Sequence, residues 1–109
     1  MTPKRYDIVL VGLNPAIGNE MAKTRPAVVV SADEMNAALE TVVVCPLTTK
    51  LHPRWRSRVP ITTGGKRAEI AVDQIRTVSQ RRIMRRLDKL SAKAAAELRR
   101  TISEMYGEG

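Results

Sequence analysis

Apolar residues along this chain occur in short runs separated by turn-forming residues, a pattern that predicts many short strands. Most of the apolar positions are small or branched side chains, which pack well on the pleated surface of a sheet. Residues 73–78 alternate polar and apolar side chains, as half-buried strands do. The expected strands cover residues 7–11, 27–30, 41–45, 59–61, 68–72, 73–78 and 84–90.

Three prolines set the expected limits of these strands, because proline lacks the N–H that a strand ladder needs. Pro26 is tolerated just before the strand at 27–30, and Pro46 is expected to end the strand at 41–45. Pro60 places its strand at an edge of the sheet.

Helical spacing is confined mainly to the C-terminal part of the chain. Ser91 is a good N-cap and Gly107 supplies the stop. A helix of one or two turns is expected after Ser31, which stands three residues before Glu34 as in a capping box. One further helical turn is expected at residues 79–82. The apolar face of the C-terminal helix carries Ala94, Leu98, Ile102 and Met105.

These elements predict a mainly β fold with a C-terminal α-helix. The 109 residues suffice for a single domain (1–109) with its own core. Short strands and one terminal amphipathic helix indicate a small, bent antiparallel sheet, or half-open barrel, that the helix closes at one end. Residues 12–24 form a loop too long for a tight turn, and ordered loops of this length are usually functional.

The charge balance indicates an acidic partner. Nineteen Lys and Arg residues against eleven Asp and Glu give a formal net charge of +8. A small domain this basic usually meets nucleic acid, an anionic membrane surface or an acidic protein segment. Composition alone does not rank these three.

The lone cysteine, Cys45, lies in an apolar run and is expected to be a buried small side chain. No apolar stretch is long enough to span a bilayer, and the N-terminal residues lack a signal-peptide cleavage pattern, so we expect a cytoplasmic protein that does not enter membranes. One histidine, one cysteine and scattered carboxylates show no ligand spacing, so we expect neither metal nor cofactor.

Arg25 and Thr48 are the first candidates for chemistry. Arg25 precedes one expected strand and Thr48 follows another, so both can lie at one rim of the barrel. A guanidinium binds phosphate bidentately, and a hydroxyl donates to a phosphate oxygen. The alternative for Arg25 is a structural ion pair with a nearby carboxylate such as Glu20.

The segment 50–58 is a candidate surface for single-stranded nucleic acid. It combines one aromatic side chain that can stack on a base with several charges that can follow a phosphate backbone. The alternative is a solvated loop whose tryptophan packs on the barrel. His52, the only histidine, is a candidate for acid–base chemistry, although a solvated histidine is the simpler interpretation. The stacking and charged residues are Lys50, Arg54, Trp55, Arg56 and Arg58.

Four blocks of the sequence stand out in order: residues 24–31, 46–49, 59–60 and 72–77. Together they resemble the signature blocks of the MazF/PemK toxin endoribonucleases. Residues 7–11, 13–15 and 18–20 near the N-terminus and 86–91 before the C-terminal helix also fit, so the resemblance covers nearly the whole chain. Several blocks in the correct order are more specific than any single motif.

The resemblance implies an SH3-like barrel that forms a homodimer and acts as the toxin of a type II toxin–antitoxin pair. It implies sequence-specific cleavage of single-stranded RNA without metal, as in an mRNA interferase. The 2′-OH would be the nucleophile, and the products would be a cyclic phosphate and a 5′-hydroxyl. The implied partners are single-stranded RNA, a second copy of the chain and a cognate acidic antitoxin, and the net charge agrees in sign with both acidic partners.

The resemblance also implies roles for individual residues. Arg25 and Thr48 fall on the catalytic pair of one branch of the family, and Glu20 falls on a first-loop glutamate that some members need. Because arginine stays protonated, we assign Arg25 to stabilising charge on the phosphoryl oxygens and Thr48 to fixing the phosphate. Glu20 is the first candidate for the general base and His52 the second. Another branch has an arginine where this chain has Ala71, so that branch's acid–base scheme does not transfer.

The remaining candidates are expected to bind RNA. For Asp73 and Gln74, at a strand junction, the simpler interpretation is a turn cap. Two other functions stay open: a non-nuclease toxin of the CcdB gyrase-inhibitor kind, and an RNA-binding barrel without chemistry. The first acts through a Trp-Gly-Ile ending, which residues 106–109 lack. The expected RNA-binding residues are Lys23, Lys50, Arg54, Trp55, Arg56, Arg58, Asp73, Gln74 and Arg76.

Overall fold

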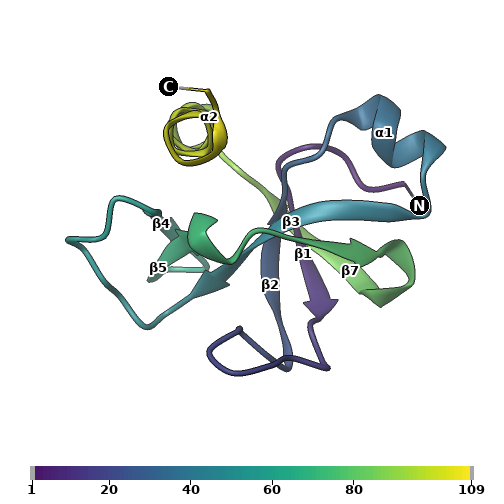
Figure 1. The fold of residues 1–109 in the computed structure, drawn as a ribbon, viewed down its shortest axis with the longest axis horizontal. Coiled ribbons are helices and arrows are strands. Elements are labelled where there is room, and N and C mark those ends of the chain that lie inside the picture. Colours follow the sequence, from purple (N-terminus) through teal and green to yellow (C-terminus); the bar gives the residue numbers. More distant parts are fainter. Residues whose placement is uncertain (1, 109) are drawn as a thin grey trace.

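Seven strands form one antiparallel sheet in the computed structural model, which describes residues 2–108 (Figure 1). The strand order is β4-β5-β3-β2-β1-β7, and β6 pairs with β3 beside this path. The strands are β1 (Asp7–Gly12), β2 (Thr24–Val29), β3 (Thr41–Thr48), β4 (Arg58–Thr63), β5 (Lys66–Ala71), β6 (Arg76–Ser79) and β7 (Ile83–Lys89). The helices are α1 (Asp33–Ala38) and α2 (Ala92–Tyr106), with 3₁₀ turns η1 (Val72–Gln74) and η2 (Gln80–Arg82).

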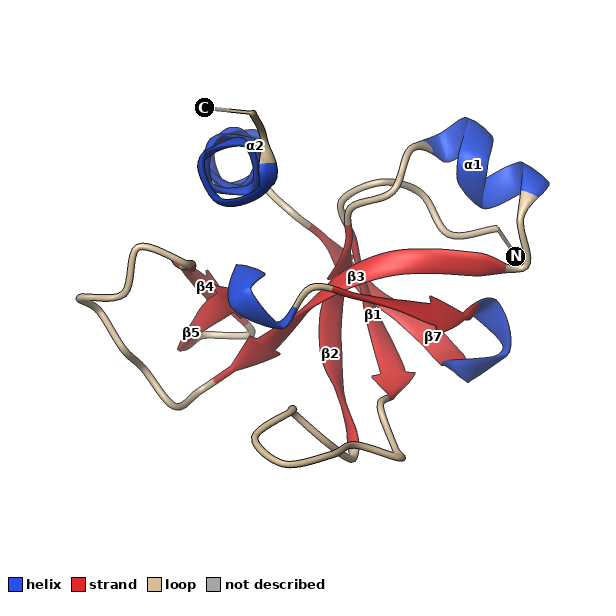
Figure 2. Ribbon diagram, in the orientation of Figure 1, coloured by secondary structure: helices blue, strands red, loops and turns tan. Residues whose placement is uncertain are grey.

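Strand β3 joins the two parts of this curled sheet. Its first half pairs with β6 over residues 41–44, and its last two residues pair with β5. Its middle pairs with β2 over residues 44–46. Figure 2 shows the consequence: the β4–β5 hairpin projects to one side of β3, while β1, β2 and β7 cross behind it. The result is the predicted half-open barrel with a C-terminal helix.

Apolar side chains fill the core on both faces of the central strands. Because successive side chains of a strand point to opposite faces, Ile8 and Val28 join one cluster whereas Val9 and Val29 join the other. Helix α2 covers the first cluster, in which Leu98 is fully buried. The second cluster lies beneath the loop that follows β1 and includes the fully buried Leu13.

Most predicted elements are present close to their expected limits. The Ser91 hydroxyl accepts a hydrogen bond from Ala94 N (3.2 Å) and so caps α2, which ends before Gly107 as predicted. Strand β4, which contains Pro60, lies at an edge of the sheet. Cys45 is fully buried, and this burial, followed by the charge of Asp73, raises the pKa of its thiol to about 12.

Two strands extend past the prolines that were expected to limit them. Arg25 and Pro26 lie inside β2, opposite Val11 and Leu10 of β1, rather than ahead of the strand. Strand β3 continues through Pro46 to Thr48 because its last residues gain a second partner, β5. Each proline removes one N–H donor from the hydrogen bonds between strands, and the paired residues on either side of it keep the strand extended.

Two local predictions were wrong. Residues 73–78 do not form one strand: η1 takes up the first two, and β6 begins only at Arg76. Ser31 does not cap α1, whose N-cap is Ala32 without a side-chain bond. The Ser31 hydroxyl is instead buried, donating to Asn36 Oδ1 (2.5 Å) and accepting from Val43 N (3.0 Å).

In the described part of the chain, helices are too short or too polar to cross a bilayer.

Candidate active site

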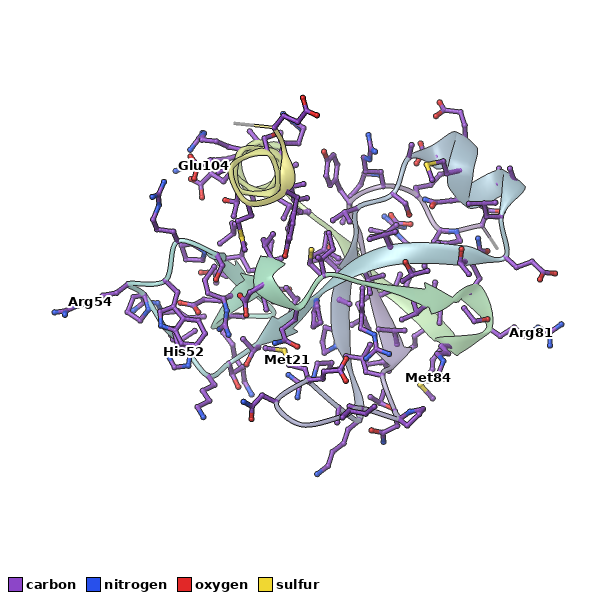
Figure 3. The ribbon with its side chains drawn as sticks, in the orientation of Figure 1. Met21, His52, Arg54, Arg81, Met84 and Glu104 are labelled. Atoms are coloured by element: carbon purple, nitrogen blue, oxygen red, sulfur yellow. The ribbon has the colours of Figure 1, made fainter. Side chains whose placement is uncertain are left out.

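An open cleft of about 890 Å³ lies at the end of the barrel where β2 begins and β3 ends. Two loops flank it: the first loop, residues 13–23 between β1 and β2, and the basic loop, residues 49–57 between β3 and β4. Met21 on the first loop and His52 on the basic loop both line the cleft (Figure 3). Further lining comes from residues 19, 20, 22, 25, 26, 47–50, 55, 58, 73 and 74.

Arg25 faces this cleft from β2 and is held by backbone carbonyls alone. Its Nε donates to Ala22 O (3.2 Å) and its Nη1 to Leu47 O (3.4 Å). Within residues 2–108, no carboxylate pairs with its guanidinium, so the ion pair with Glu20 does not form. Arg25 therefore keeps an uncompensated positive charge at the cleft.

Thr48 lies next to Arg25. The carbonyl of Leu47, which receives the Arg25 guanidinium, directly precedes Thr48 at the end of β3. The Thr48 side chain is buried against the cleft, and its Oγ1 accepts a hydrogen bond from Lys50 N (3.1 Å). An acceptor role leaves the hydroxyl proton of Thr48 free to donate to a ligand oxygen.

Glu20 lines the same cleft from the exposed first loop. Its Oε1 accepts a hydrogen bond from Ile17 N (2.8 Å), which closes a turn within the loop. Lys23, at the other end of the loop, adopts a positive φ of 66°, and its N–H donates to Asn14 Oδ1 (3.0 Å). The structure thus brings all three predicted catalytic residues, Glu20, Arg25 and Thr48, to one cleft.

Arg58, which the sequence grouped with the exposed RNA-binding cations, is buried and paired at the start of β4. Only 6% of its side chain is exposed, and its Nη1 lies 3.2 Å from Glu69 Oε1. Its Nε donates to Asp73 Oδ1 (2.9 Å), so two carboxylates share its charge. A buried arginine must be paired in this way, and its pairing leaves little of the guanidinium for a phosphate.

Glu69 is the functional candidate that sequence reasoning missed. Its side chain is only 4% exposed, and besides Arg58 it accepts a hydrogen bond from His52 N (2.9 Å). The available signal was a single acidic residue within an otherwise apolar strand at 68–72. A buried charge in such a place calls for a specific partner.

Trp55 and His52 lie against one another at the mouth of the cleft. Their ring centroids are 3.9 Å apart and the planes differ by 7°, and the Arg58 guanidinium carbon lies 4.7 Å from the Trp55 ring centre. Trp55 remains 48% exposed, so it does not pack into the barrel core. The other cations of the basic loop are exposed: Lys50, Arg54 and Arg56.

Three further predicted RNA-binding residues connect segments around the cleft. Asp73 accepts from Ser57 Oγ (2.8 Å) in addition to Arg58. Gln74 Oε1 accepts from Met21 N (3.2 Å) of the first loop. Arg76 Nη1 donates to Leu13 O (3.2 Å), at the start of that loop. These bonds give all three residues structural roles, although Asp73 and Gln74 also line the cleft.

The cleft has the composition of an anion-binding site. An unpaired guanidinium, a hydroxyl and exposed cations suit a phosphate. Among residues 2–108, no three His, Cys, Asp or Glu side chains come together as a metal site would require. The fold is a small SH3-like half-open barrel, and the residues that line its cleft suit an anionic ligand.

Comparison with known proteins gives the family. The sequence model of the PemK-like, MazF-like toxins of type II toxin–antitoxin systems matches residues 4–106, and the chain belongs to this family. It is 33% identical over 105 residues to endoribonuclease MazF9 of Mycobacterium tuberculosis, covering 87% of this chain and 88% of that protein.

Solved structures show the same fold. A crystal structure of MazF from Deinococcus radiodurans aligns with a TM-score of 0.86 at 23% identity, over 99% of both chains. A MazE–MazF structure from the same organism aligns with a TM-score of 0.80 at 23% identity, over 100% of this chain and 99% of that chain. The family resemblance and the fold class expected from the sequence are both confirmed.

The paired state of Asp73 makes a prediction about stability in acid. Partial burial favours its neutral form, but hydrogen bonds from Arg58 and Ser57 outweigh this and lower the pKa of Asp73 below its ordinary value. Because the pKa of Asp73 is lower in the folded protein than in the unfolded chain, its ionised form stabilises the fold at pH values above the unfolded pKa of about 3.9. This stabilisation is lost as the pH falls through the pKa of Asp73 in the folded protein. Asp73→Asn should therefore lower the melting temperature by several degrees at pH 7 but by much less near pH 3. An equal loss at both pH values would contradict the assignment.

Proposed function

We propose that this chain is the RNA-cleaving toxin of a type II toxin–antitoxin pair, a metal-independent endoribonuclease that cuts single-stranded RNA at short sequences. The observation that carries the proposal is Arg25: its guanidinium is held by carbonyls at a basic cleft, beside the Thr48 hydroxyl, with its charge unpaired. The name endoribonuclease of the Mycobacterium tuberculosis relative supports the same activity.

The proposed reaction uses the RNA itself as nucleophile. The 2′-OH attacks the adjacent phosphorus, the bond from phosphorus to the 5′-oxygen breaks, and the products are a 2′,3′-cyclic phosphate and a 5′-hydroxyl. Arg25 stabilises the negative charge that grows on the non-bridging oxygens, and Thr48 donates a hydrogen bond to one of them. The 2′-OH proton goes to a general base, and a proton goes to the leaving 5′-oxygen.

Glu20 is our first candidate for the general base. It lies on the wall of the same cleft as Arg25, and its carboxylate has one oxygen that is not used by the Ile17 N–H. His52 is the second candidate, although its ring is stacked on Trp55. Glu20→Gln, which keeps the shape of the side chain, separates the two because it should slow cleavage only if Glu20 takes the proton.

The activity is tested by incubating the purified chain with a labelled single-stranded RNA in EDTA. We expect discrete cuts whose ends are cyclic phosphates and 5′-hydroxyls. Arg25→Ala should lower single-turnover cleavage by roughly 10²–10³, the loss usual for one preorganised donor at developing charge. Its melting temperature should be nearly unchanged, because Arg25 has no buried ionic partner.

Arg25→Lys is the matched control for charge. It keeps the cation but loses the planar fork, so we expect only part of the rate to return. Binding of RNA without cuts would indicate a non-catalytic RNA-binding barrel. A destabilised Arg25→Ala with normal turnover per folded molecule would end the catalytic assignment.

The exposed cations of the basic loop should follow the RNA backbone. Arg56 is 88% exposed with one surface pair to Glu104 at 3.5 Å, and Arg54 points away from the body of the protein (Figure 3). Log affinity falls as log salt rises, and each phosphate that is no longer neutralised should make this slope less steep by about 0.7 for a single strand. Arg54→Ala and Arg56→Ala should each show this decrease in titrations with labelled RNA.

Arg81 is the matched control, because it is an exposed arginine at the opposite end of the molecule from Arg54 (Figure 3). Arg81→Ala should leave the salt slope unchanged. An unchanged slope in the Arg54→Ala, Arg56→Ala double variant would rule out the basic loop as the phosphate track.

We also propose a homodimer and an acidic antitoxin as partners, acting in the cytoplasm. Strands β4 and β7 lie at the two ends of the main strand order, and Met84 on β7 is 65% exposed, so a symmetric partner can cover an edge. The +8 charge suits an acidic segment that folds on binding, and the Deinococcus radiodurans MazF was crystallised with MazE. Sedimentation at micromolar concentration should give a dimer, and a monomer would refute that part.

A further inference from the structure

The buried carboxylate of Glu69 joins the two ends of the basic loop. Its Oε1 accepts from His52 N (2.9 Å) near the start of the loop and from Arg58 Nη1 (3.2 Å) just after its end. Arg58 Nη1 also reaches Lys50 O (3.4 Å), so the loop is closed at its base by one carboxylate and one guanidinium. This closure lies in the part of the protein with almost no solvent access, since both side chains are at most 6% exposed.

The same two groups set the position of the stacked rings. Glu69 fixes the backbone of His52, whose ring lies 3.9 Å from that of Trp55. Arg58, held by Glu69 and Asp73, brings its guanidinium carbon 4.7 Å from the Trp55 ring centre. Trp55 therefore has neighbours that are each anchored to a buried carboxylate, while 48% of its surface stays exposed.

The position of Glu69 in the sheet relates this arrangement to the cleft. Glu69 is the register partner of Thr48 across β3 and β5, and residues paired across strands present their side chains on one face. The buried Glu69 carboxylate thus lies beside the predicted phosphate site, although Glu69 is not among the residues that line the cleft.

We propose that Glu69 is a positioning residue that holds the His52–Trp55 pair as a preformed stacking surface for an RNA base next to the scissile phosphate. The inference deepens the proposed function and rests on it. A surface fixed before binding does not lose the conformational entropy of ordering a loop, so it raises affinity without taking part in the chemistry. Glu69 touches neither RNA nor the reacting atoms.

The first test needs no RNA, because Trp55 is the only tryptophan of the chain and its fluorescence reports this loop alone. Glu69→Gln keeps the shape of the side chain but removes one of the two carboxylate charges that hold Arg58. Quenching of Trp55 by acrylamide should increase by about twofold and its fluorescence anisotropy should fall, as a ring freed from fixed neighbours requires. Unchanged quenching and anisotropy would overturn the proposal.

The second test measures binding to a 2′-O-methyl RNA pool of mixed sequence, in which the nucleophile is blocked. Glu69→Gln should weaken binding by roughly tenfold, within the range that one base stack contributes. Trp55→Ala should give a similar loss, and the double variant should lose less than about twofold more, because residues that act through one another are not additive. Cleavage at saturating cleavable RNA should stay within about twofold of the wild type in single turnover. Full additivity would overturn the proposal.

Asp7→Asn is the matched structural control. Asp7 is also a buried carboxylate, 5% exposed, paired with an arginine (Arg86 Nε, 3.1 Å), but it lies on β1 away from the cleft. It should lower the melting temperature as Glu69→Gln does while leaving Trp55 quenching and RNA affinity unchanged. An equal effect of both variants on RNA affinity per folded molecule would show a merely structural role.

The outcomes also separate this inference from the proposed function. If the wild type binds no 2′-O-methyl RNA and cuts no RNA, the proposed function fails and this inference fails with it. If the wild type binds and cuts RNA but Glu69→Gln binds as tightly, only the role of Glu69 fails. Should Glu69→Gln not fold, Asp73→Asn removes the other carboxylate that holds Arg58, and the same increase in Trp55 quenching without RNA, in smaller measure, is required.

Discussion

The buried charge of Arg58 is the constraint on which the rest of the site depends. A guanidinium removed from water is stable only with partners of opposite charge, and here Glu69 and Asp73 provide them from β5 and η1. Satisfying this one charge brings together the end of the basic loop, the β4–β5 hairpin and the turn that follows it. Asp73 is followed by Gln74, which binds Met21 N, so the first loop is connected to the same point.

The two arginines nearest the cleft show opposite solutions to the same electrostatic problem. Arg58 is neutralised by carboxylates and therefore supports the structure. Arg25 is held by carbonyl dipoles of Ala22 and Leu47, which orient the guanidinium without cancelling its charge. A charge that is fixed in place and not neutralised is what stabilisation of a phosphoryl transition state requires. The distinction between them lies in the partners and not in the residue type.

The scaffold explains why both loops meet at one place. Strands β2 and β3 are antiparallel, so the start of β2 and the end of β3 fall at the same end of the sheet, and the loops attached there flank one cleft. Both faces of β1 and β2 are packed with apolar side chains, and the fully buried Leu13 anchors the first loop to one of these clusters. A rigid double-sided core thus carries the loops in which the candidate chemistry resides.

The sequence by itself determined the elements whose signal is local. Short branched runs predicted the strands, and Ser91, the apolar spacing behind it and Gly107 predicted α2, because propensity, capping and periodicity depend only on neighbours along the chain. The ordered blocks of sequence also sufficed for the family. The same blocks predicted Arg25, Thr48 and Glu20 as catalytic residues, and all three line one cleft.

Only the tertiary structure decided which charges are free and which are paired. Arg58 stands among Arg54 and Arg56 in the sequence, and nothing local separates them, yet its partners come from residues 11 and 15 positions away. Nothing in the sequence near Glu69 indicates that its carboxylate binds His52 N and Arg58, which the folded structure shows. Strand β3 likewise passes Pro46 because a distant strand pairs with its end. Pairing of buried charges and strands is a long-range energy, and it is settled only when the chain has folded.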